Sequence, residues 1–290
     1  MIGEIKDRVG IGWRPDLAAG ILSNLDKIDL VEVVADDYFG ASHAKVRSLK
    51  TLASQVPVVL HGVSLGMASS ESVDSRRLQK MARLLDEIRP ECWSEHLAFV
   101  RAGGVEIGHL AMPPRTGQTV EGAAENIEAA KSTTGARPLL ENIATLIDPP
   151  GSSLSEVAWI ASILEASGCD LLLDLHNLYA NATNFDYDPV DFIRHLPAER
   201  IAAIHLSGGK WIKAPNDNGH RLLDDHLHDV PDAVYNLLQE VAARAIRPLT
   251  VILERDGNYP SMENLLQQLS RAREALANGR FNSSGLLTKA

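Results

Sequence analysis

Eight short apolar segments recur along the chain, and each ends on or just before polar residues of the types that bind metal ions. The segments are continuous runs rich in Val, Leu and Ile, which is typical of strands buried on both faces. Amphipathic helical stretches such as 71–88 lie between them, so strand and helix alternate. This alternation predicts an α/β fold, a single-domain (β/α)8 TIM barrel. The predicted strands are 9–13, 30–35, 56–63, 92–100, 138–143, 169–178, 201–207 and 249–255.

Length and composition agree with one barrel and exclude several classes of protein. Such a barrel needs about 250 residues, and the chain has 290. Cys92 and Cys169 each open a predicted strand without a close partner in the sequence, which favours a reducing compartment, and we expect the cytoplasm. No window approaches the roughly 18 apolar residues of a membrane span. A net charge of −10 argues against a nucleic-acid partner.

Histidine and carboxylate side chains gather at the predicted strand ends. A lone His beside an apolar strand is more often a core residue than a ligand, but several together with carboxylates favour Fe, Mn or Zn. About nine candidates exceed the roughly three to five ligands that one ion uses, so two or three ions and a bridging carboxylate are expected. The alternative is that these carboxylates only form ion pairs at the barrel mouth. The candidates are His61, His96, Glu141, Asp174, His176, His205, Asp224, His226 and Glu254.

Nine short motifs, in this order, make the chain similar to the multinuclear non-haem iron-dependent oxidative enzymes, the DUF692 or UPF0276 family. The resemblance extends from Gly10 to about Leu276. On this resemblance residues 1–278 form a metal-dependent oxidase domain. The small and polar composition of residues 279–290 predicts a disordered tail. The motifs are Gly-Ile-Gly-Trp-Arg (10–14), Val-Glu-Val-Val-Ala-Asp-Asp-Tyr-Phe (31–39), Leu-His-Gly-Val-Ser-Leu (60–65), Ser-Glu-His-Leu-Ala (94–98), Leu-Leu-Glu-Asn (139–142), Leu-Leu-Asp-Leu-His-Asn (172–177), Ile-His-Leu-Ser-Gly (204–208), Asp-Asp-His (224–226) and Leu-Glu-Arg-Asp-Gly-Asn (253–258).

The resemblance implies a barrel that holds two or three irons in mixed Fe(II) and Fe(III) states. It implies three sites: His61, His96 and Glu141; then Asp174, His205 and Glu254 with Glu141 as the bridge; then a weaker site of Asn177, Asp224 and His226. It also implies that Glu141, Asp174 and Asn177 are the catalytic residues.

The chain departs from the family pattern in two places. His176 precedes Asn177 where the family often has Asn-Asn, so His176 is either an extra ligand or a hydrogen-bond donor to one. Asp225 and His228 lie beside Asp224 and His226 in the sequence. The choice of carboxylate and of imidazole for the third site therefore stays open.

The implied reaction is O2-dependent oxidation of a cysteine in a ribosomally synthesised precursor peptide. The substrate thiolate binds a ferric ion, O2 binds a neighbouring ferrous ion, and the iron-superoxo species removes hydrogen from the cysteine β-carbon. The family commonly needs a small partner protein that binds the leader peptide. The compact length and the Gly-Trp-Arg start are most similar to the carbon-excising branch of the thia-amino-acid pathways.

Two connections, 101–118 and 209–229, are too long to be simple turns between a strand and a helix. In a barrel both follow the carboxyl ends of strands, where active sites are built. The second carries Trp211 between Lys210 and Lys213, which suit an acidic residue or a terminal carboxylate on a peptide. We therefore expect these three residues to bind substrate. The alternative is that the connection is a solvated surface loop without a binding role.

Three other functions fit parts of the pattern. A sugar isomerase or epimerase of the xylose-isomerase-like type, the main alternative, also places Glu, Asp and His around one or two divalent ions. An endonuclease IV-like phosphodiesterase would use three zinc ions, but the acidity of the chain argues against a nucleic-acid substrate. A peptide-binding or metal-storage protein would bind metal without consuming O2.

Overall fold

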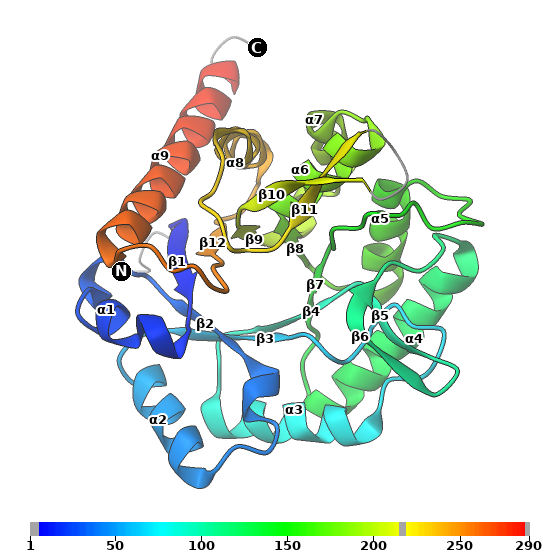
Figure 1. The fold of residues 1–290 in the computed structure, drawn as a ribbon, viewed down its shortest axis with the longest axis horizontal. Helices are drawn as coiled ribbons and strands as arrows, with labels where there is room; N and C mark the ends of the chain where they lie inside the picture. Colours follow the sequence, from blue (N-terminus) through cyan, green and yellow to red (C-terminus); the bar gives the residue numbers. More distant parts are fainter. Residues whose placement is uncertain (1–5, 215–218, 288–290) are drawn as a thin grey trace. The chain divides into compact units, whose positions relative to one another are not determined.

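The computed structural model describes residues 6–214 and 219–287. Its main sheet is a closed barrel in the strand order β1-β12-β9-β8-β7-β4-β3-β2 (Figure 1), which confirms the predicted (β/α)8 fold. All eight predicted strands are present; the first is shifted by one residue, and the other seven are shorter than the apolar runs. They are β1 (Arg8–Gly12), β2 (Val31–Val34), β3 (Val58–Gly62), β4 (Trp93–His96), β7 (Leu139–Glu141), β8 (Leu171–Asp174), β9 (Ile201–Leu206) and β12 (Thr250–Leu253).

Helices follow the barrel strands. In α3 the buried Leu78, Met81, Leu84 and Ile88 form one apolar stripe, as their spacing predicts. The helices are α1 (Ala18–Leu22), α2 (His43–Ala53), α3 (Ser75–Ile88), α4 (Gly117–Thr134), α5 (Glu156–Ser167), α6 (Leu175–Phe185), α7 (Pro189–His195), α8 (Asp232–Arg244) and α9 (Met262–Leu287), with short 3-10 turns at Pro15–Leu17, Leu25–Lys27, Ala35–Tyr38 and Ala198–Arg200. None of the helices in the described residues is both long and apolar enough to cross a bilayer.

The contacts of the chain divide it into two compact units, which are described separately below. The first unit comprises Met1–Asp29, Ala144–Leu146 and Leu173–Ala290. Within it β12 pairs in parallel with both β1 and β9, and the register places Ile252 beside His205. Glu254 follows this ladder directly, because its N–H donates to the Leu206 carbonyl at 2.8 Å.

The second unit comprises Leu30–Ile143 and Ile147–Leu172. Its parallel strands β2, β3, β4 and β7 pair in sequence order. The register sets His61 opposite Ser94, and His96 opposite Glu141. His96 and Glu141 therefore lie directly opposite each other on adjacent strands, and His61 lies on the next strand, level with the residue two positions before His96.

Each long connection contains an antiparallel hairpin rather than an irregular loop. In the second unit β5 (Phe99–Ala102) pairs with β6 (Val105–Ala111). In the first unit β10 (Gly209–Lys213) pairs with β11 (His220–Asp224).

Two predicted boundaries differ from the structure. The run 169–178 does not continue as a strand, because Asp174 ends β8 and caps α6, accepting a hydrogen bond from the Asn177 N–H at 2.6 Å. The disordered tail predicted from residue 279 is also not what the structure shows, since α9 continues to Leu287. Arg280 holds this part of the helix through an ion pair with Asp7, 2.8 Å between Nη2 and Oδ1. Residues 288–290 lie outside the described part of the chain.

Candidate metal centre

The first ligand group lies in the second unit and consists of His61, His96 and Glu141. The Nε2 atoms of both histidines lie 3.4 Å from Glu141 Oε2. All three side chains are buried, and the imidazole centroids are 4.7 Å apart in an edge-to-face arrangement. One ligand atom from each residue lies within 4.8 Å of the others, a spacing that one cation can fill.

Neighbouring residues hold this group in place. Ser94 Oγ lies 2.7 Å from His61 Nδ1, which leaves His61 Nε2 directed toward Glu141. Glu95 is fully buried, and its two oxygens accept hydrogen bonds from the backbone N–H groups of His96 at 2.9 Å and Leu65 at 3.1 Å. Glu95 therefore ties the end of β4 to the segment after β3.

The second group lies in the first unit and consists of Asp174, His205 and Glu254, from the ends of β8, β9 and β12. Their ligand atoms also lie within 4.8 Å of one another, and all three residues are buried. His205 Nδ1 lies 3.1 Å from Glu254 Oε2. Two carboxylates and one imidazole in a buried site form a donor set suited to a transition metal or zinc.

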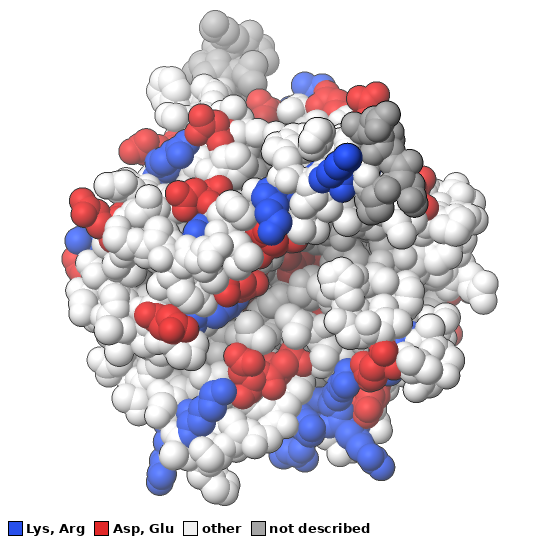
Figure 2. Space-filling view, in the orientation of Figure 1, with Lys and Arg blue, Asp and Glu red and all other residues white. Residues whose placement is uncertain are grey.

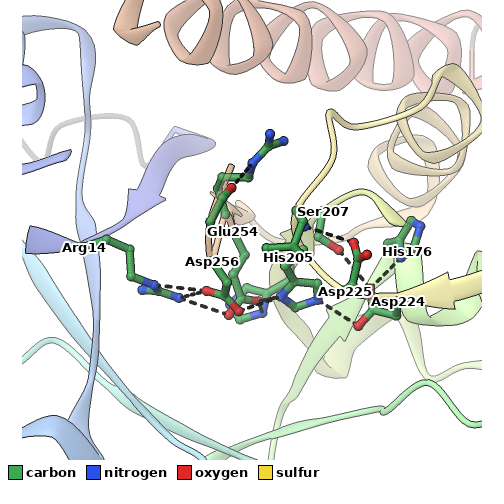
Figure 3. A network of polar contacts seen from close by, with 12 residues as sticks. Arg14, His176, His205, Ser207, Asp224, Asp225, Glu254 and Asp256 are labelled. Carbon is green, nitrogen blue, oxygen red and sulfur yellow. Dashed lines mark hydrogen bonds and ion pairs between the residues drawn. The ribbon is translucent and has the colours of Figure 1, made fainter. Parts of the chain in front are cut away.

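The third group surrounds His226, which has a positive φ of 54°. Its Nδ1 lies 3.4 Å from both Glu254 Oε2 and Asp256 Oδ2, and its Nε2 lies 2.9 Å from Asp224 Oδ2. Arg14 pairs with Asp256 at 2.5 Å and with Glu254 at 3.5 Å. Figure 3 shows the resulting network, with Arg14 at one end and the His176–Asp224 pair at the other.

The charges in this network favour a cation at its centre. Burial works to raise the pKa of Asp224, but the positive charge of His226 and the hydrogen bond from His176 outweigh it and lower the pKa to about 2. Burial likewise opposes ionisation of Glu254, yet His226 and His205 hold the pKa of Glu254 well below its usual value. Burial acts to lower the pKa of His226, but Glu254 and Asp224 raise the pKa well above its ordinary range. Carboxylates held in their ionised form around a shared centre are groups that a bound metal ion would neutralise.

The structure places the predicted residues as follows. His61, His96 and Glu141 form one group, Asp174, His205 and Glu254 form another, and Asp224 bonds to His226. Asn177 is buried in the first turn of α6 beside Asp174. The predicted substrate-binding residues lie on β10, where Lys210 and Lys213 are exposed and Trp211 is 56% exposed.

Of the Asp-Asp pair, Asp224 faces the third group. Asp225 instead lies 2.9 Å from His228 Nδ1 and 3.4 Å from Lys210 Nζ. His176 contacts Asp224 through Nδ1, so the structure places it as the partner of a candidate ligand.

Sequence reasoning missed Asp256, which completes the third group with His226 and Glu254. The sequence did contain an indication of this role, because Asp256 lies two residues beyond Glu254 within the motif 253–258. The pairing of Arg14 with Asp256 was also not predicted, since it joins residues 242 positions apart.

Comparisons with known proteins show the family and the fold of the chain. Residues 8–277 match the family described as RiPP precursor modification enzyme MbnB/TglH/ChrH. A UPF0276 protein of Acaryochloris marina is 33% identical over 263 residues, covering 91% of this chain and 92% of its own length. A UPF0276 protein of Streptomyces avermitilis is 35% identical over 274 residues, and the chain spans about half of it, 54%. A crystal structure of D-psicose 3-epimerase in the presence of D-fructose shares the fold, with a TM-score of 0.55, 14% identity and coverage of 95% and 99%.

Proposed function

Because the chain belongs to the MbnB/TglH/ChrH family of RiPP precursor modification enzymes, we propose that it uses iron and O2 to oxidise a cysteine in a ribosomally synthesised precursor peptide. The observation that carries this proposal is the presence of three groups of imidazole and carboxylate side chains at ligand spacing, two of them buried. Ligand groups of this kind would allow a redox-active metal to oxidise a bound peptide.

Iron fits the donor set. Imidazole and carboxylate ligands without thiolate suit iron, although they also suit Mn and Zn. In this proposal His61, His96 and Glu141 hold one ion, and Asp174, His205 and Glu254 hold a second. Glu254 is shared with the third group, in which Asp256 joins His226. Asp224, whose Oδ2 lies 2.9 Å from His226 Nε2, and Asn177 are further candidate ligands of this third group in the proposal.

Glu141 is the proposed bridge between the first two ions. Its β7 position pairs with Leu172 of β8, and Asp174 follows two residues later on the same strand. Because side chains alternate along a strand, Leu172 and Asp174 point to the same face. Adjacent strands of a barrel end at the same mouth, so the Glu141 carboxylate is suited to serve both groups.

When bound, iron would supply one-electron redox chemistry with O2 and open coordination positions for a substrate thiolate. The chain itself supplies the rest. Ser94 orients His61, the first turn of α6 orients Asp174 through its Oδ1, and His176 orients Asp224. Such partners fix the direction and the basicity of ligands. Arg14 offsets the excess negative charge of Glu254 and Asp256.

The test is turnover of a Cys-containing peptide encoded beside the gene. The protein would be loaded with Fe(II) without O2, mixed with the peptide and exposed to O2, while O2 uptake and the peptide mass are followed. We expect peptide-dependent O2 uptake and a mass change at the cysteine, and neither with Mn or Zn in place of iron. If iron-loaded protein with every such peptide consumes no O2, and the Mn-loaded protein isomerises or epimerises a ketose, the sugar isomerase replaces the proposal.

A further inference from the structure

The backbone of β11 shows which edge of the β10–β11 hairpin is free. Leu222 donates its N–H to Asn184 Oδ1 at 2.8 Å and accepts a bond from Asn184 Nδ2 at 2.9 Å. Both backbone groups of Leu222 therefore point away from β10 and toward α6. In an antiparallel ladder the residue opposite must then be in a non-hydrogen-bonded pair, and that residue is Trp211.

It follows that the Trp211 N–H and C=O point away from β11, to the outer edge of β10. Ala214 lies three residues after Trp211, so the alternation predicts that its N–H points toward the opposite strand. This N–H does donate a hydrogen bond across the hairpin, to the Gly219 carbonyl at 3.1 Å. No other hydrogen bond to the backbone of Trp211 occurs within residues 6–214 and 219–287. One edge of the hairpin is thus covered by α6, and the other can pair with an added strand.

Basic residues outnumber acidic ones on β10 and β11, where Asp224 is the one carboxylate and Lys210 pairs with Asp225, although the whole chain carries a net charge of −10. Lys210, Lys213 and Arg221 all lie on this hairpin, and Figure 2 shows basic side chains over this part of the surface. Lys213 forms no ion pair in the described part of the chain, and it shares a face of β10 with Trp211 because side chains alternate. An extended peptide with acidic residues complements this edge.

The base of the hairpin adjoins the ligand groups of the first unit. Gly209 pairs with Asp224 in the register, and His205 lies four residues before Gly209 in the chain. A Cβ at Gly209 would lie 2.6 Å from His176 Cε1 and 2.1 Å from the Leu223 carbonyl oxygen, so only glycine allows this close approach. A peptide paired along β10 therefore extends toward Asp224 and the groups around it.

We infer that an extended, acidic segment of the peptide substrate binds as a third strand on the free edge of β10. It would pair through the N–H and C=O of Trp211 and place an acidic side chain near Lys213. Strand addition of this kind obtains affinity from backbone hydrogen bonds and specificity from alternate side chains. The inference rests on the proposed function only for the identity of the peptide.

Binding is measured without O2, so that a failure of turnover does not affect the result. The probe is the fluorescein-labelled precursor peptide with its cysteine replaced by serine, titrated into iron-loaded protein. Trp211→Ala keeps the backbone N–H, whereas Trp211→Pro removes it. We expect Pro to weaken binding by about three- to tenfold more than Ala does, the effect of one net hydrogen bond. Equal affinities of the two variants would overturn strand pairing.

A scan of N-methylated peptides gives a second measurement that does not depend on the folding of a variant. Only alternate N–H groups of an added strand face β10, so methylation should weaken binding at every second residue of the docked segment. A uniform or absent effect along the segment contradicts the inference.

Charge is tested by Lys213→Gln against Lys213→Arg. We expect the first to weaken binding about two- to fivefold at low salt and the second to leave it nearly unchanged. Trp211→Ala combined with Lys213→Ala should weaken binding further, while iron content stays at the unmutated level. Iron content and thermal unfolding of each variant show whether the fold is intact. If Lys213→Gln binds the peptide as tightly as the unmutated protein does, the inference that an acidic side chain lies near Lys213 is wrong.

Discussion

His176 Nδ1 lies 2.6 Å from Asp224 Oδ1. An ionised carboxylate can only accept, and the pKa of Asp224 is lowered to about 2, so the imidazole N–H donates this bond. The bond holds the Asp224 carboxylate toward His226, 2.9 Å from its Nε2. One side chain that sequence reasoning left undecided is thus the partner that orients a candidate ligand.

The variant His176→Asn tests that role, because the shorter side chain cannot reach Asp224 in the same way. We expect metal affinity of the His226 group to fall by about 10- to 100-fold, the usual effect of losing a ligand's partner. The other two groups should keep their metal. His195→Asn is the matched control, since His195 is exposed on α7. Iron titration followed by elemental analysis distinguishes the two variants, and equal iron contents would argue against an orienting role.

Replacing Glu141 tests the proposed bridge. Glu141→Gln keeps the size of the side chain but removes its charge, and we expect iron content to fall by more than one equivalent. His226→Ala should spare most of the iron in the other two groups, because His226 is itself a member of the third group only. Elemental analysis after anaerobic loading gives the answer. Loss of the same single equivalent in both variants would assign the bridge to another residue.

The number of ligand groups predicts the number of ions. Three ligand groups, of which the second and third share Glu254, should bind between two and three irons per chain. The third ion should bind more weakly, because Arg14 already pairs with two carboxylates of that group. Titration with Fe(II) under anaerobic conditions should show two tight equivalents and a weaker one. A single equivalent, or zinc that iron cannot replace in active protein, is incompatible with the multinuclear proposal.

Direct binding of a substrate thiolate to iron has a spectroscopic consequence. Anaerobic addition of the cognate peptide to iron-loaded protein should produce a sulfur-to-iron charge-transfer band in the visible spectrum, and O2 should discharge it. The Cys→Ser peptide should give neither change, because a neutral hydroxyl is a much poorer iron ligand than a thiolate. Deuterium at the cysteine β-carbon should slow the decay if hydrogen removal limits it. Absence of the band with every encoded peptide would count against thiolate binding.

The sequence by itself determined the barrel and identified most of the candidate ligand residues that the structure groups together. Runs buried on both faces, separated by amphipathic helices, allow few other folds, and parallel strands bring their carboxyl ends to one mouth. Strand-end residues such as His61, His96 and His205 were therefore identifiable from position alone. The alternation also misled at one point, since an apolar run cannot show where β8 ends and α6 begins. The Asp174 cap decides that boundary through one hydrogen bond.

Only the tertiary structure decided which polar residues meet. Asp224 and Asp225 are adjacent and chemically identical, yet one faces His226 and the other faces Lys210 and His228. Asp256 joins the third group because its N–H bonds to the carbonyl of His226, which has a positive φ. The free edge of β10 likewise follows from Asn184, 27 residues before Trp211. These choices depend on side-chain directions and contacts between distant segments, which local patterns of hydrophobicity do not encode.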